Sequence, residues 1–142
     1  MGLKVNNASF KTTFEYVPLA QRGEKKPFTI IFEALKMDKL AKLKDNAMRV
    51  DENGNYTVSL NTLNYEVLKS GIVGWKNIED AKGAVKFKSD KQGASDESLT
   101  LIPIDIRNEI ATIIVEVSND LPNAEEYLAE IDRLFAESAK ED

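Results

Sequence analysis

The sequence contains no histidine and no cysteine among its 142 residues. These absences exclude a Ser-His-Asp or Cys-His nucleophile, a disulfide, and the usual zinc and copper ligands. The remaining carboxylates are scattered over expected helix faces and loops. Only Glu33 and Asp105 stand among apolar neighbours, and strand alternation and a helix start explain them. We therefore expect a protein that is not an enzyme and that binds no metal and no cofactor.

Long apolar runs are also missing. No segment approaches the length of a membrane span, and the N-terminal residues lack the apolar core of a signal peptide. Together with the lack of cysteine, this favours a cytoplasmic protein without membrane contact. The net charge is −5, from nineteen basic and twenty-four acidic residues. An acidic chain is poorly suited to nucleic acid, whose binding depends on neutralised phosphates, so we expect no nucleic-acid partner.

What the chain does contain is typical of one globular domain spanning residues 1–142. Apolar residues make up 42% and charged residues 30%, which is an ordinary balance for a folded protein. The charge is uneven: residues 1–50 carry ten basic and five acidic side chains, and residues 51–142 carry nine and nineteen. We interpret this asymmetry as solvated faces, with oriented association as the alternative.

The N-terminal part alternates in polarity with the period of a half-buried strand. One side of the first strand carries Phe10, Thr12, Phe14 and Tyr16, and one side of the second carries Phe28, Ile30, Phe32 and Ala34. A polar loop over residues 19–27 separates them. This pattern predicts an antiparallel β-hairpin over residues 10–35. Since an isolated hairpin is marginally stable, its aromatic face must rest on helices, another strand or another subunit.

Helical periodicity dominates residues 36–140 and predicts about four helices. The first two carry their apolar stripes at Met37, Leu40, Ala41 and Leu43 and at Leu60, Leu63, Val67 and Leu68. Gly71 follows the second helix at a position that suits a left-handed end. Four lysines in residues 36–44 occupy the other side of the first helix, where we favour a solvated face over a phosphate site.

The last two helices are expected after Pro103 and after Asn123. Their stripes are Ile106, Ile110, Ile113, Ile114 and Val117, and then Tyr127, Leu128, Ile131, Leu134 and Phe135. Because residues 103–117 are rich in β-branched side chains, a strand remains the alternative there. Asn123 followed by Glu126 resembles a capping box. The predicted fold class is α+β, an N-terminal antiparallel β-hairpin followed by a mostly helical part.

Two polar segments read as connections. Residues 51–55, Asp-Glu-Asn-Gly-Asn, invite comparison with a calcium-binding loop, but the ligand spacing is incomplete and no glutamate closes the loop. A turn at Asn53-Gly54 is the better interpretation. Residues 89–98 are small, polar and charged, which is typical of a mobile connection.

The stretch from residue 73 to 87 reads Val-Gly-Trp-Lys-Asn-Ile-Glu-Asp-Ala-Lys-Gly-Ala-Val-Lys-Phe and contains the only tryptophan. Its large apolar residues predict a connection that packs onto the domain. With the order of elements around it, the stretch resembles the tail assembly chaperones of long-tailed phages, of the siphophage type. The residues that carry this resemblance are Gly74, Trp75, Ile78, Gly83, Val85 and Phe87. The polar segment 89–98 is longer than is usual in that family.

The resemblance implies a non-catalytic protein of the host cytoplasm. Members of the family bind the tape measure protein and help to gather tail tube protein around it, so these two are the implied partners. We expect apolar recognition of amphipathic partner segments, with the six motif residues packing inside the domain. A structural virion component of the tail or neck and a small cytoplasmic interaction module are the alternatives. The sequence leaves the oligomeric state and the partner-binding surface open.

Overall fold

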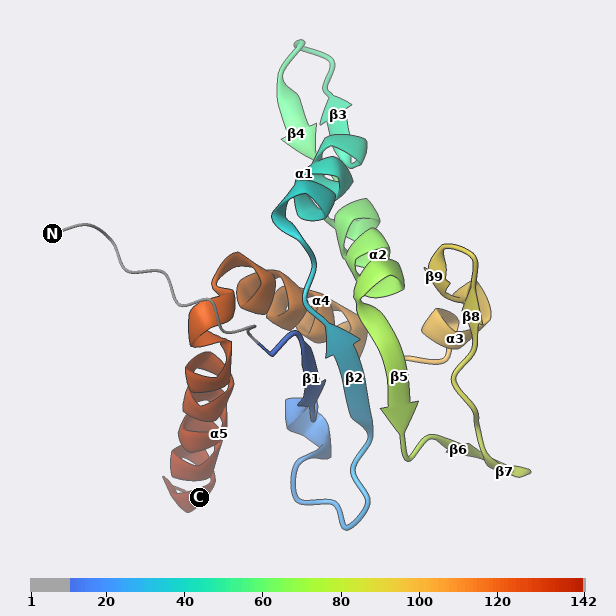
Figure 1. The fold of residues 1–142 in the computed structure, drawn as a ribbon, viewed down its shortest axis with the longest axis vertical. Coiled ribbons are helices and arrows are strands. Elements are labelled where there is room, and N and C mark those ends of the chain that lie inside the picture. Colours follow the sequence, from blue (N-terminus) through green and yellow to red (C-terminus); the bar gives the residue numbers. More distant parts are fainter. Residues whose placement is uncertain (1–10, 142) are drawn as a thin grey trace, which may run out of the picture.

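A three-stranded antiparallel sheet, in the order β1-β2-β5, lies at the centre of the computed structural model (Figure 1). The structure describes the backbone of residues 11–141 and the side chains of residues 11–138, so Phe10 lies outside it. The strands are β1 (Thr13–Tyr16), β2 (Thr29–Glu33) and β5 (Ile72–Lys76), and a short 3-10 turn (Leu19–Gln21) follows β1. The predicted α+β fold class is confirmed.

The predicted hairpin is present as β1 and β2. Phe14 lies opposite Phe32 and Tyr16 opposite Ile30, and all four side chains are buried. The rings of Phe14 and Phe32 stack with their centroids 5.6 Å apart. Alternation therefore identified the inner face of the sheet, although Thr12 is exposed.

The connection expected to pack onto the domain after Gly71 begins with the third strand of the sheet, β5. It pairs with the free edge of β2 and so gives partners to the outer row of N–H and C=O groups on that strand. Ile30 lies opposite Trp75 and Phe32 opposite Ile72, with an irregularity between them. Gly74 pairs with Ile31 and Ile72 pairs with Phe32, so Val73 between them has no partner on β2. Its side chain is 47% exposed.

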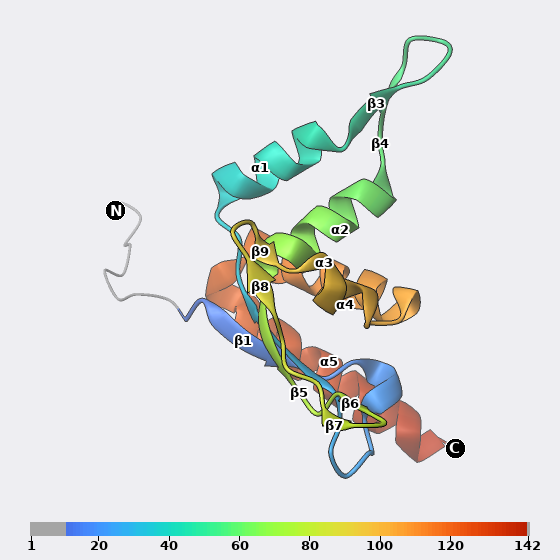
Figure 2. The ribbon, with the colours of Figure 1, turned by 90° about the vertical axis from the view of Figure 1, so that its right-hand side faces the viewer.

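Five α-helices lie within residues 11–141: α1 (Met37–Asn46), α2 (Leu60–Gly71), α3 (Asp96–Thr100), α4 (Ile104–Asn119) and α5 (Ala124–Glu141). The doubt about residues 103–117 is resolved in favour of helix, because α4 covers them. Helices α2 and α4 pack side by side in the same direction, with Asn64 beside Asn108 and Gly71 beside Ile114. The core fills the space between these helices and the inner face of the sheet (Figure 2).

The capping geometry expected at two helix ends is wrong, although α5 does begin directly after Asn123. Gly71 has no positive φ and is the last residue of α2; a Cβ there would lie 3.1 Å from two side-chain carbons of Ile114. Close helix packing thus accounts for this glycine. The side chain of Asn123 donates to the Asp120 carboxylate, and a 3-10 turn (Leu121–Asn123) precedes α5 in place of a capping box.

Three short two-stranded ribbons make the region after residue 36 less helical than predicted. They are β3 (Met48–Val50) with β4 (Tyr56–Val58), β6 (Glu79–Asp80) with β7 (Gly83–Ala84), and β8 (Ser89–Asp90) with β9 (Gly93–Ala94). The turn predicted at Asn53-Gly54 is confirmed between β3 and β4, where Gly54 has φ of 80°. An oxygen of Asp51 accepts the backbone N–H groups of Asn53 and Asn55 at 2.9 and 2.8 Å.

Residues 89–98, expected to be a mobile polar connection, form the β8–β9 hairpin and the start of α3. The buried ammonium of Lys69, on α2, explains this arrangement. It donates to a carboxylate oxygen of Asp90 at 2.9 Å and to the carbonyl oxygen of Ala94 at 2.8 Å, and it pairs with Asp96 at 3.4 Å. The positive charge of Lys69 on α2 thus holds this polar segment in a fixed conformation.

The last helix leaves much of its apolar stripe near the surface. On α5, Tyr127, Leu128, Ile131 and Phe135 are half-buried and Leu134 is 53% exposed. None of the helices among the described residues combines the length and the apolar character needed to cross a membrane.

Candidate functional site

The residues of the 73–87 stretch gather around the indole of Trp75. The Trp75 Nε1–H donates to the carbonyl oxygen of Val85 at 2.9 Å, and the Trp75 ring meets those of Phe87 and Phe28 edge to face, at 5.2 and 6.4 Å. The backbone N–H of Val85 donates to the Ile78 carbonyl oxygen at 2.8 Å. Trp75, Ile78 and Phe87 pack at the margin of the core, and the Val85 backbone is hydrogen-bonded to Trp75 and Ile78.

The two motif glycines lie elsewhere in the same segment. Gly83 forms the β6–β7 turn with φ of 117°, a conformation that favours glycine. Gly74 lies in β5 opposite Ile31, where an added Cβ would meet the Ile31 side chain at 3.5 Å. The motif as a whole builds a folded segment, and Ile78 and Val85 also line a cavity of about 450 Å³ between this segment and α3.

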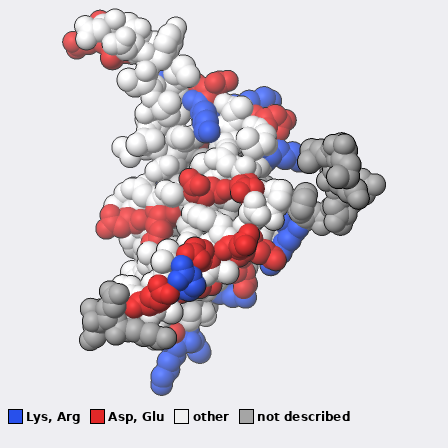
Figure 3. All heavy atoms as spheres, turned by 90° about the vertical axis from the view of Figure 1, so that its left-hand side faces the viewer, with Lys and Arg blue, Asp and Glu red and all other residues white. Residues whose placement is uncertain are grey.

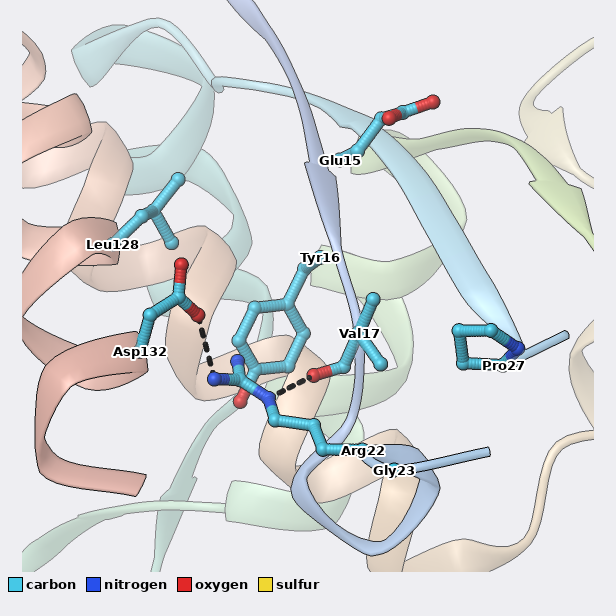
Figure 4. Close-up of a pocket in the computed structure, with 8 residues that line it drawn as sticks. All are labelled: Glu15, Tyr16, Val17, Arg22, Gly23, Pro27, Leu128 and Asp132. Atoms are coloured by element: carbon cyan, nitrogen blue, oxygen red, sulfur yellow. Dashed lines mark hydrogen bonds and ion pairs between the residues drawn. The ribbon is translucent and has the colours of Figure 1, made fainter. Parts of the chain in front are cut away.

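A cavity of about 320 Å³ opens between β1, the following loop and α5, and Arg22 crosses it (Figure 4). The Arg22 Nε–H donates to the carbonyl oxygen of Val17 at 3.0 Å, and Nη1 pairs with Asp132 at 2.6 Å. The guanidinium also lies 5.4 Å from the centroid of the Tyr16 ring and 5.6 Å from that of Phe135. These contacts attach the loop after β1 to α5.

Beside this cavity, Glu109 accepts two hydrogen bonds, from the Tyr16 hydroxyl and from the backbone N–H of Leu19, the latter at 2.9 Å. Burial, and secondly the carboxylate of Glu109, raise the pKa of the Tyr16 phenol. A phenol held neutral in this way is a hydrogen-bond donor and a poor nucleophile. Sequence reasoning missed Arg22 and Glu109, because their partners lie about ninety or more residues away.

The most exposed apolar surface lies on the β3–β4 arm, which we define as residues 48–58. The arm projects from the body of the molecule (Figures 1 and 2). Met48 pairs with Val58 and Val50 with Tyr56, so four apolar side chains share one face of the ribbon. Their exposed fractions are 42% for Met48, 44% for Val58, 61% for Val50 and 74% for Tyr56.

A further exposed apolar side chain, Leu60, follows the arm at the start of α2, where it is 67% exposed. A two-stranded ribbon with a bare apolar face is marginally stable by itself, and exposed patches of this kind mark binding surfaces. The sequence did carry a signal: the alternating residues on either side of Asn53-Gly54. Only the pairing of the two strands shows that the apolar residues before and after this turn lie on the same face of the ribbon.

The surroundings of the arm differ in charge from the opposite end of the molecule. Exposed lysines at 36, 39, 42 and 44 lie on or beside α1, next to the arm, and exposed acidic residues at 38, 45, 51 and 52 partly offset their charge. Helix α5 carries five acidic residues and one basic residue between positions 124 and 138. Figure 3 shows acidic side chains in rows across the face on which α5 lies. A partner on the arm therefore meets a more basic environment than one on α5.

Among the side chains of residues 11–138, no group of three or more carboxylates is placed to hold a metal ion. Comparisons of the chain with models of protein families, with curated proteins and with solved structures find no match. Function must therefore be inferred from the arm and its surroundings.

Proposed function

We propose that the protein is a non-catalytic binding protein whose β3–β4 arm holds an amphipathic segment of a partner. The observation that carries this proposal is the bare apolar face of Met48, Val50, Tyr56 and Val58 on a projecting ribbon. Burying a fully exposed side chain of this kind gains about 1.5–3 kcal/mol, and Met48 and Val58, which are already partly covered, gain less. Covering this face with a partner therefore offers a driving force that the isolated chain leaves unused.

The resemblance of residues 73–87 to phage tail assembly chaperones gives this activity its specific form. In that form the partner is the tape measure protein, the tail tube protein is a second partner, and the site of action is the host cytoplasm. A helix with one apolar side fits a flat apolar ribbon, because residues at i, i+3, i+4 and i+7 form a matching stripe.

The affinity expected of the arm is modest. A face of four side chains is smaller than a standard protein–protein interface, and association also costs rotational and translational freedom. Weak contacts repeated along a long partner would keep that partner soluble and still permit release. This is the behaviour that assembly around a tape measure protein requires.

Co-expression with the tape measure protein of the same genome tests the proposal. The double variant Val50→Ser, Tyr56→Ser should reduce the soluble and co-purifying tape measure protein while leaving the melting temperature near that of the wild type. Leu134→Ser is the matched control, because this leucine is similarly exposed but lies on α5. It should leave capture unchanged.

Two results would contradict the proposal. A wild-type protein that neither binds nor solubilises the tape measure protein would exclude the chaperone function. Equal capture by the wild type and the arm variant would exclude the arm as the binding surface. A protein that remains in purified particles at a stoichiometric level would instead be a structural virion component.

A further inference from the structure

A second feature lies between the N-terminal halves of α2 and α4. A cavity of about 270 Å³ opens there, and its lining includes the side chains of Asn61, Asn64, Asn108 and Arg107. Among the residues lining it there is no carboxylate. The Nδ2 of Asn64 donates to the Oδ1 of Asn108 at 3.2 Å, so the Asn108 amide nitrogen is available as a donor. Tyr65, Leu68 and Ile104 complete the lining, so the cavity combines apolar walls with a few hydrogen-bond donors and no lining carboxylate.

Arg107 differs from the other arginines. The guanidinium groups of Arg22, Arg49 and Arg133 donate to carboxylates or carbonyl oxygens. Within the part of the chain that the structure describes, the Arg107 Nε is buried and has no hydrogen-bond partner, and its guanidinium forms no ion pair. Because the Arg107 guanidinium has no hydrogen-bond or ion-pair partner among the described residues, its terminal Nη groups can serve an acceptor from outside the chain.

We propose that the α2–α4 cavity binds a carboxylate through Arg107, and that this carboxylate is an Asp or Glu side chain of the segment held by the β3–β4 arm. The planar guanidinium offers paired donors that match the two oxygens of a carboxylate. The asparagine amides around it supply further donors. The inference that a carboxylate binds depends only on the cavity. The inference that this carboxylate belongs to a protein partner rests on the proposed function.

The arm and the cavity are continuous. Strand β4 ends at Val58 and α2 begins at Leu60, so Asn61 of the cavity lies in the first turn after the apolar face. Leu60 is 67% exposed, and Ile104, which lines the cavity, is 53% exposed. A partner helix on the arm could thus extend its apolar contacts to this end of α2 and place one acidic side chain in the cavity.

The first experiment tests the chemistry on the isolated protein. In NMR spectra of ¹⁵N-labelled protein, sodium acetate should shift the Arg107 Nε–Hε signal saturably, together with side-chain amide signals of Asn61 and Asn108. Sodium chloride at equal ionic strength should not. The Arg133 Nε–Hε signal is the internal control, because that group already donates to Glu130.

The absence of a saturable acetate shift would overturn the proposal. So would a saturable shift with inorganic phosphate alone, which would make the cavity a phosphate site. The Arg107→Met variant assigns the signal and tests for a purely structural role. It should melt at the same temperature as the wild type or higher, because it removes an unsatisfied buried donor. A clear fall in melting temperature would mean that Arg107 supports the fold.

The second experiment tests the source of the carboxylate. In the co-expression assay, Arg107→Met should weaken capture of the tape measure protein about tenfold, the loss expected for one charge-assisted contact. Unchanged capture together with a positive acetate titration would assign the cavity to a free small carboxylate and overturn the assignment to a partner. If the wild type captures no tape measure protein, the proposed function fails, and the acetate titration still decides the cavity.

Discussion

The β3–β4 arm and the β8–β9 hairpin are both small antiparallel ribbons. The apolar ribbon is exposed, whereas the polar ribbon is packed against the body of the protein. The arm is apolar on one face and exposed, with Tyr56 74% exposed. The β8–β9 hairpin is polar in sequence, yet Ala94 is fully buried and Lys69 of α2 holds its two ends. Polarity alone would have assigned the first ribbon to the core and the second to the solvent.

The difference shows that contacts with another helix or strand, and not the polarity of the ribbon itself, decide whether a short ribbon is buried. Lys69 supplies the β8–β9 hairpin with buried hydrogen bonds, whereas no described element covers the apolar face of the arm. A surface that the fold leaves bare at a projecting position is available to a different molecule. The following predictions test this contrast, from the largest expected effect to the smallest.

Gly93→Ala should lower the free energy of unfolding by more than about 3 kcal/mol, because strain and backbone overlap combine there. Gly93 has φ of 132°, and an added Cβ would overlap the carbonyl oxygen of Lys69. Gly83→Ala in the β6–β7 turn is the control: φ is 117°, but nothing lies within 4 Å. It should lower stability by about 1 kcal/mol. Urea unfolding measures both, and equal losses would show that the β8–β9 contact is unimportant.

Lys69→Met should lower the free energy of unfolding by about 2 kcal/mol, because the Ala94 carbonyl oxygen loses its buried donor. The control is Lys88→Met, which breaks an exposed pair with Glu97 and should change stability by less than about 0.5 kcal/mol. Chemical denaturation distinguishes them. Similar values for the two variants would mean that the buried ammonium does not hold the hairpin.

Alkaline pH should weaken the same junction. Burial, and then a hydrogen bond to Asp96, raise the pKa of Tyr65 from 10.0 to about 12. Because the folded pKa lies above the unfolded one, this contribution to stability is complete below pH 10 and is lost as the pH rises towards 12. Tyr65→Phe should reduce the slope of unfolding free energy against pH in that window. The raised pKa of Lys69 leaves some slope in the variant. An unchanged slope would contradict the prediction.

Val50→Ser combined with Tyr56→Ser should change the free energy of unfolding by less than about 1 kcal/mol, since both side chains are exposed. Thermal unfolding measures the change. A larger loss would show that the arm supports the fold of the isolated chain, and it would weaken the case for a binding surface.

The sequence predicted those parts of the fold in which one periodicity settles the structure. Alternation gave the β1–β2 hairpin, and the stripe of Ile110, Ile114 and Val117 gave α4. Strand β5 was missed because the extra residue Val73 interrupts its alternation. The β8–β9 hairpin was missed because a lysine is usually solvated, and nothing in its own segment marks Lys69 as buried.

The candidate surfaces depended still more on tertiary structure. Packing of Trp75 with Phe87 agrees with the expectation of a folded central segment, although the hydrogen bond to Val85 was not foreseen. The apolar face of the arm requires the Met48–Val58 register. Arg107 is one charged residue in an amphipathic helix, and only the absence of an acceptor around its Nε distinguishes it.

During synthesis, the strands of the central sheet are made before the helix that covers their inner face. Strand β2 ends at Glu33, whereas α4, which helps to cover its inner face, begins at Ile104. At usual translation rates, the roughly 70 residues between them take on the order of 4–14 s to make. During that interval Phe14 and Phe32 lack the α4 part of their cover, and the β2–β5 pairing must wait for residue 72. The nascent chain is therefore vulnerable to aggregation before its C-terminal helices emerge.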